Sequence, residues 1–448
     1  MGTNIAIEKI QAKTIYRSIL DNLERYLPLL SILSFISGIV SARYFPSVGY
    51  KVTSGMSGFI DFYEYIAPFI IYFILAPSIA HIIELGRGYF ASYAVLWLIR
   101  LRLYACLWSI VFTAIVFKLP FYTNSGGSLG KSIVQTLSSI VTTMTHSTYF
   151  YAIYAALITV VLFQRYKIIG GVLGKIYALI EKLGELFLPL VPVFMFAIGA
   201  FVYTLPLELN GHLSMKELTG ARLGDLNLIW GRLPVNTSVG IILAYVVTSL
   251  LVGLACIIWH IGFLVILKNT LKDFSIKHYF SKYWVRIYPL LWSTASESLS
   301  TPLNLHLVKK HYPYIATEVR RFIIGAGSYL GINGTTICVF IMAAAVAQLL
   351  GIELSVVKLL MSIPLVILIG FGVPGIPGEL LLFAGPLAIY LNIPPNMAPA
   401  FTALYIGLQF GLPDSFRTGN NTTDICVASL YLNKDFDKKF TRGPRKSD

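Results

Sequence analysis

The sequence predicts an all-α polytopic membrane protein, with eight transmembrane helices and two re-entrant helical hairpins. Two observations indicate the class: hydrophobic residues make up 56% of the 448 residues while charged residues make up 12%, and the mean hydropathy is +0.72. Soluble domains carry about 25% charged residues, so lipid must be the solvent of this chain. Apolar stretches recur that are long enough to cross a hydrocarbon core about 30 Å thick.

The eight predicted helices are spread over most of the chain. In order, they cover 27–46, 58–85, 89–118, 149–164, 175–204, 239–268, 315–350 and 396–430. Lys and Arg gather in short loops and in both tails, which is the bias of cytoplasmic segments. Both termini are therefore predicted to be cytoplasmic, and the formal charge of +14 needs no nucleic-acid partner. The first apolar run has no cleavage site after it, so we expect this helix to remain.

The chain shows no sequence pattern of an enzyme or of a zinc site. Its four cysteines stand singly in apolar segments, without a CxxC pair or a histidine at ligand spacing. We expect them to be small apolar core residues. The HExxH, nucleophile-elbow and Walker patterns do not occur, so no catalytic residues are expected.

Two apolar segments in the C-terminal third are too short or too broken to be ordinary spans. The first, 284–307, carries a cluster of hydroxyl side chains around Glu297, and the second, 356–391, is interrupted by glycines and prolines at 370–378. Proline removes a backbone donor and glycine loosens a helix, so both segments are predicted to be re-entrant hairpins. A matched pair of interrupted segments is typical of a membrane-depth binding site.

The seventh and eighth predicted spans carry polar residues at membrane depth. Two glycines flank Asn333 in the stretch 331–335, which indicates local unwinding; the alternative is a helix packed through small residues. In the eighth span, Asp414, Arg417, Asn421 and Asp424 are three, four and three residues apart, which places them on one helix face. A charge at mid-membrane costs about 2.5–3.5 kcal/mol, so these residues need partners or a ligand.

Asp414 and Arg417 indicate the chemistry of that ligand. Arg417 offers a planar fork of donors that suits a carboxylate, and Asp414 can accept from an ammonium group. Together they would hold a small zwitterion that bears an additional acid. The alternative is that the two side chains neutralise each other at i and i+3.

The order of these motifs resembles the glutamate transporter family, the dicarboxylate/amino acid:cation symporters. Residues 331–335 stand where the family has its NMDGT motif, 373–375 match the VPG tip of its second hairpin, and 414–418 match its DRFRT stretch. The resemblance is strong from about Lys277 to Leu432 and is collinear from residue 27 onward.

The resemblance implies inverted repeats, an elevator fold and a homotrimer in the plasma membrane, which transports acidic amino acids or related dicarboxylates. The implied organisation is a cytoplasmic segment 1–26, mainly scaffold and trimerisation helices 27–164, a fifth span 165–204 in the scaffold, an extracellular loop 205–238, a sixth span 239–275, a transport domain 276–432 and a cytoplasmic tail 433–448. The transport domain comprises a first hairpin at about 276–307, the seventh span 315–350, a second hairpin 354–392 and the eighth span 396–432.

The resemblance also implies roles for single residues. Asp414 would bind the substrate's amino group, Arg417 its side-chain carboxylate, and Thr335 and Asn421 its other polar atoms, while the hairpin tips supply backbone contacts. The full implied set is Ser296, Glu297, Ser298, Thr335, Val373, Gly375, Gly378, Asp414, Arg417, Thr418 and Asn421.

The residues that correspond to the family's sodium sites depart from its pattern. The remnant site would consist of Gly327, Gly331, Asn333, Asn420 and Asp424. Because Gly331 and Asn333 replace an asparagine and an aspartate of the motif, a carboxylate ligand is gone and sodium coupling is expected to be weak or absent, with a proton or no ion in its place. Asp424 corresponds to the family's acidic ligand only if one residue is deleted, and the matching amide is then either Asn420 or Asn421.

Glu297 stands where the family has a serine that helps to hold the substrate's main-chain carboxylate. An ionised glutamate there would repel an acidic ligand. Either Glu297 is protonated and carries a proton, or it pairs with Arg417 and shifts the preference to neutral amino acids, or it points to cytoplasmic water. A substrate-gated anion conductance on the same scaffold is a further alternative.

Overall fold

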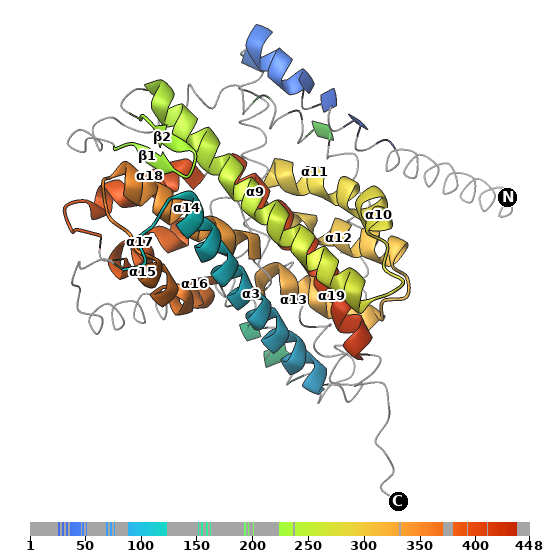
Figure 1. The fold of residues 1–448 in the computed structure, drawn as a ribbon. Helices are drawn as coiled ribbons and strands as arrows, with labels where there is room; N and C mark the ends of the chain where they lie inside the picture. Colours follow the sequence, from blue (N-terminus) through green and yellow to red (C-terminus); the bar gives the residue numbers. More distant parts are fainter. Residues whose placement is uncertain are drawn as a thin grey trace, which may run out of the picture.

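The computed structural model describes residues 88–122, 224–235, 238–330, 333–370, 380–391, 393–409 and 411–436, together with single positions and short stretches within 26–76, 151–162 and 192–200. These residues form helices and one small sheet (Figure 1). Predictions for Gly331, for the tip 371–379 of the second hairpin, for a minor part of the first span and for most of the second, fourth and fifth spans lie outside the described residues.

Two helices in the described part of the chain are long and apolar enough to cross a membrane. They are Tyr89–Val116 within α3 (Gly88–Val116) and Leu243–Thr270 within α9 (Ser238–Thr270). They coincide with the third and sixth predicted spans. Each keeps large aliphatic side chains exposed, such as Ile115 on α3 and Leu254 on α9, as expected of helices that face lipid or other apolar helices.

A β-hairpin lies in the predicted loop 205–238, and the all-α prediction missed it. Strand β1 (Leu226–Leu228) pairs antiparallel with β2 (Gly231–Leu233), and Gly231 adopts φ +144° directly after the turn. Each strand has only three residues, too few for an alternating pattern to be recognised. The hairpin is tied to helix ends: the Ile229 amide donates to the Val116 carbonyl at 2.8 Å and the Asn227 amide to Gln348 Oε1 at 2.9 Å.

The first predicted hairpin is a pair of helices joined by a tight turn. The chain passes from α10 (Ile276–His278) through a π-helical turn η1 (Tyr279–Trp284) into α11 (Val285–Thr294). Ala295 is left-handed, with φ 48° and ψ 26°, and ends α11 before α12 (Glu297–His311) returns. The hydroxyl of Tyr283 donates to Asn304 Oδ1 at 2.8 Å and joins the two arms.

The seventh predicted span contains two described helices, and the eighth is divided into two helices. The seventh consists of α13 (Thr317–Leu330) and α14 (Asn333–Leu349). The eighth, expected as one segment, consists of α18 (Ala398–Gln409) and α19 (Leu412–Asp435). The reason is Gly411, whose φ of 80° ends α18, while the proline in the first turn of α19 starts a new helix. The arms of the second predicted hairpin are α15 (Val356–Met361), α16 (Ile363–Gly370) and α17 (Leu381–Tyr390).

Helix α19 is the centre of the packing. It contacts α9, α11, α13 and α14, and α3 packs against α14 (Figure 1). Trp97 of α3 stacks on Tyr431 of α19 with ring centroids 5.1 Å apart. Helix α3 therefore lies against the C-terminal elements, although it falls in the segment 27–164 that was predicted to contain mainly scaffold helices. All four cysteines are buried and free, which confirms their expected place in the core.

Candidate functional site

A buried ion pair on α19 forms the centre of a first cluster. Nε and Nη2 of Arg417 each lie 2.7 Å from Oδ1 of Asp414, one turn earlier on the helix. Nη1 of Arg417 donates to Thr335 Oγ1 of α14 at 3.1 Å. Arg417 is 0% exposed and Asp414 1%. The two side chains therefore do neutralise each other, and the same contacts fix the plane of the guanidinium group.

Asn421 connects this ion pair to the first hairpin. Its Nδ2 donates to Thr335 Oγ1 at 2.8 Å and to Glu297 Oε1, while its Oδ1 accepts from the Thr335 amide at 3.1 Å. The last bond joins the first described turn of α14 to α19. Glu297 is fully buried. The structure thus places Glu297 beside the implied binding residues, and the alternative in which it points to cytoplasmic water is wrong.

The turn of the first hairpin is also attached to α19. Thr418 Oγ1 donates to the carbonyl of Ala295, the left-handed residue of the turn, at 3.2 Å. Ser296 follows directly and is buried. Of the other implied binding residues, the side chain of Ser298 and all of Val373, Gly375 and Gly378 lie outside the described part of the chain.

A glycine allows α14 to approach α19 at this point. A Cβ added to Gly334 would lie 2.2 Å from the backbone oxygen of Arg417, a distance that real side chains do not reach. The absence of a side chain at residue 334 therefore brings Thr335 within reach of both Arg417 and Asn421. This gives a physical role to Gly334, the second glycine of the 331–335 stretch.

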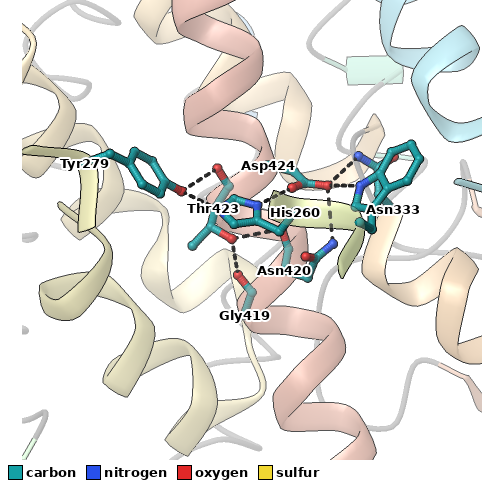
Figure 2. Close-up of polar contacts among 8 residues, drawn as sticks. His260, Tyr279, Asn333, Gly419, Asn420, Thr423 and Asp424 are labelled. Atoms are coloured by element: carbon teal, nitrogen blue, oxygen red, sulfur yellow. Dashed lines mark hydrogen bonds and ion pairs between the residues drawn. The ribbon is translucent and has the colours of Figure 1, made fainter. Parts of the chain in front are cut away.

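A second cluster surrounds Asp424, which is fully buried one turn beyond Asn421 (Figure 2). Its Oδ2 accepts from Trp259 Nε1 at 2.7 Å, from Asn333 Nδ2 at 2.8 Å and from Asn420 Nδ2 at 3.3 Å. Its Oδ1 lies 2.7 Å from Nδ1 of His260. The partners of one carboxylate thus come from α9, α14 and α19.

Sequence reasoning missed three residues of this second cluster. Trp259 and His260 lie in α9, and the hydroxyl of Tyr279, in η1, lies 3.0 Å from Nε2 of His260. A signal for His260 was present, because an ionisable residue inside a long apolar span is by default a functional candidate. Its partner could not be read from the sequence, since Asp424 is 164 positions away.

The donors around Asp424 are a poor fit to a sodium ion. Hard cations take several oxygen ligands, whereas both oxygens of Asp424 accept from, or lie against, nitrogen atoms. Asn333 Oδ1 is a buried acceptor without a hydrogen-bond partner among the described residues, so it is one amide oxygen that could still bind a cation. Of the other remnant residues, Gly327 packs against Ile425, whose side chain lies 2.9 Å from an added Cβ, and Gly331 is not described.

The geometry separates the two adjacent amides of α19. Asn421 belongs to the cluster of Arg417 and Glu297, whereas Asn420 donates to Asp424. This is the arrangement expected if Asn421 is the residue that matches the amide of the family motif, and if the one residue missing relative to that motif lies between Asn421 and Asp424.

Comparison with known protein families gives a match over most of the chain. Residues 27–435 match the sodium:dicarboxylate symporter family. The chain belongs to that family. The match covers nearly the whole chain and confirms the resemblance to the glutamate transporters that the C-terminal motifs carried. As a member of the symporter family, the protein is an integral membrane transporter and not an enzyme. Comparison with individual curated proteins found no match.

Proposed function

We propose that this symporter-family protein is a secondary transporter of acidic amino acids, such as aspartate and glutamate, or of related dicarboxylates, and that its sodium coupling is weak or lost. The observation that carries the proposal is the fully buried Arg417, whose guanidinium plane is held by Asp414 and Thr335. A planar fork of donors held in a site of low dielectric is the group best suited to bind a carboxylate.

The neighbours of Arg417 supply the other contacts that such a substrate needs. Asp414 would accept from its ammonium group, and Thr335 and Asn421, which already bind each other, would exchange bonds with its remaining polar atoms. Ser296, Ser298, Thr418 and the glycines of the second hairpin complete the proposed site. A dicarboxylate without an amine would use Arg417 and leave Asp414 paired with it.

The proposed movement is an elevator motion of a transport domain against the scaffold of a homotrimer in the plasma membrane. Bonds of Thr418 and Asn421 tie the first hairpin to α19, and α9, α13 and α14 pack on the same helix. These contacts would let the elements move as one body, and the exposed aliphatic side chains of α3 and α9 would slide along scaffold or lipid.

A thermal-shift screen tests the substrate class. Aspartate, glutamate or succinate should raise the melting temperature of the purified protein, because a ligand that binds the native state stabilises it. Alanine and serine serve as matched neutral ligands and should have no effect. A shift with the neutral amino acids alone would support the alternative of neutral substrates, in which Glu297 keeps its charge.

Glu297 is the proposed proton carrier. A protonated Glu297 still accepts from Asn421 and no longer repels an acidic substrate, so aspartate should bind more tightly at acidic than at neutral pH. Glu297→Gln, which is neutral at any pH, should bind aspartate equally at both, as measured by calorimetry or thermal shift. The exposed Glu353 provides the control: Glu353→Gln should keep the wild-type profile. A pH dependence that persists in Glu297→Gln would exclude this role.

A further inference from the structure

The buried carboxylate of Asp424 needs a positive charge, and the residues around it identify one. An ionised carboxylate in the interior is tolerated when it is paired and hydrogen-bonded. Trp259, Asn333 and Asn420 donate neutral hydrogen bonds to it. Of the described residues bonded to Asp424, His260 is the one that can carry a positive charge, and it is itself buried.

The atoms around His260 allow its ring to hold a proton on each nitrogen. The Tyr279 hydroxyl donates to the backbone carbonyl of Thr423 at 3.3 Å, and a carbonyl oxygen can only accept. The Tyr279 oxygen also lies 3.0 Å from Nε2 of His260, and it can accept from Nε2 while its proton goes to the carbonyl. On the other side of the ring, Nδ1 lies 2.7 Å from an oxygen of Asp424. Both ring nitrogens therefore lie against oxygen atoms that can accept a hydrogen bond, as an imidazolium ion requires (Figure 2).

We infer that His260 is a built-in cation, whose imidazolium group takes the place of a coupling ion against Asp424. The inference rests on the proposed loss of sodium coupling and names the group that replaces the ion. Because this charge is covalently attached to α9, it balances Asp424 without entering or leaving with the substrate. It also binds α9 to α19, which are neighbours along their length.

The response to sodium tests the inference. The melting temperature of the full-length protein would be compared in sodium chloride and choline chloride. The melting temperature of the wild type should not be higher in sodium chloride than in choline chloride. His260→Ala and His260→Gln should melt at a lower temperature, because Asp424 loses its positive partner, and sodium should raise their melting temperature up to a saturating value. Glutamine can donate a hydrogen bond but carries no charge. A His260→Gln variant with the wild-type melting temperature and no sodium response would therefore overturn the assignment of charge.

A double-mutant cycle provides a readout that does not involve sodium. Removing one partner of a buried pair costs more than removing both. His260→Gln and Asp424→Asn should therefore each lower the melting temperature more than the double variant does, and the double variant should have no sodium response. Additive losses, or a saturating sodium response of the wild type, would overturn the inference. His278→Gln, an exposed histidine, is the control and should behave as wild type.

The same preparations separate this inference from the proposed function. An aspartate- or succinate-induced shift in the wild type supports the substrate assignment whatever the cycle gives. Additive losses together with an intact substrate shift would refute the role of His260 alone. If neither aspartate nor succinate changes the melting temperature of the wild type, the proposed function is refuted even if His260 and Asp424 are coupled.

Discussion

Arg417→Ala is expected to lower both the stability of the protein and its affinity for aspartate. Asp414 would stay buried without the guanidinium group that neutralises its carboxylate, and breaking a buried pair in this way costs about 3–5 kcal/mol. Loss of a buried charge-assisted contact to the substrate should cost about 2–5 kcal/mol, or about thirtyfold or more in Kd. Thermal unfolding and calorimetry would measure the two effects.

A double variant separates stability from binding at this pair. Asp414→Leu with Arg417→Met removes both charges and should recover part of the melting temperature lost in Arg417→Ala, because no uncompensated charge remains. It should not recover aspartate binding. Arg417→Lys keeps the charge but loses the fork, so its binding should also be weaker than that of the wild type. Normal aspartate affinity in Arg417→Ala would refute the assigned substrate role.

Gly334→Ala is expected to disrupt both clusters with the addition of a single methyl group. The new Cβ would meet the Arg417 carbonyl oxygen at 2.2 Å, and backbone cannot yield as a flexible side chain does. Overpacking costs about 1–3 kcal/mol, and the separation of α14 from α19 would also move Thr335 away from Arg417 and Asn421. We expect a lower melting temperature and the loss of the aspartate-induced shift.

Gly262→Ala is the matched control for this variant. Gly262 lies inside α9, and a Cβ added there meets no atom within 4 Å. Alanine is preferred to glycine in a helix by about 1 kcal/mol, so this variant should be as stable as the wild type or more stable, with aspartate binding unchanged. Equal behaviour of Gly334→Ala and Gly262→Ala would show that the approach of α14 to α19 is not needed.

The parts of the fold that could be predicted are those in which short-range pattern determines structure. Apolar length identified α3 and α9, and the helical spacing of Asp414, Arg417 and Asn421 placed them on one face. The division at Gly411, where φ is 80°, was missed because a lone glycine in an apolar run is tolerated in many helices.

The candidate site was predictable within α19 and not beyond it. The pairing of Asp414 with Arg417 follows from a separation of one turn. The partners of Asp424 on α9 depend on how two helices far apart in the sequence cross, which no local pattern encodes. For the same reason, the role of Gly334 became visible only once the Arg417 backbone was seen beside it.

The small β-hairpin offers a way to observe movement. Its bonds to Val116 and Gln348 fix it to the ends of α3 and α14, and Trp230 at its turn is 62% exposed. A spin label or fluorophore attached at residue 230 would therefore report the position of those helices rather than that of a free loop. Under the proposed elevator motion, distances between such labels in neighbouring subunits of the proposed trimer would change with each transport step. A label on the hairpin can therefore be used to measure that motion.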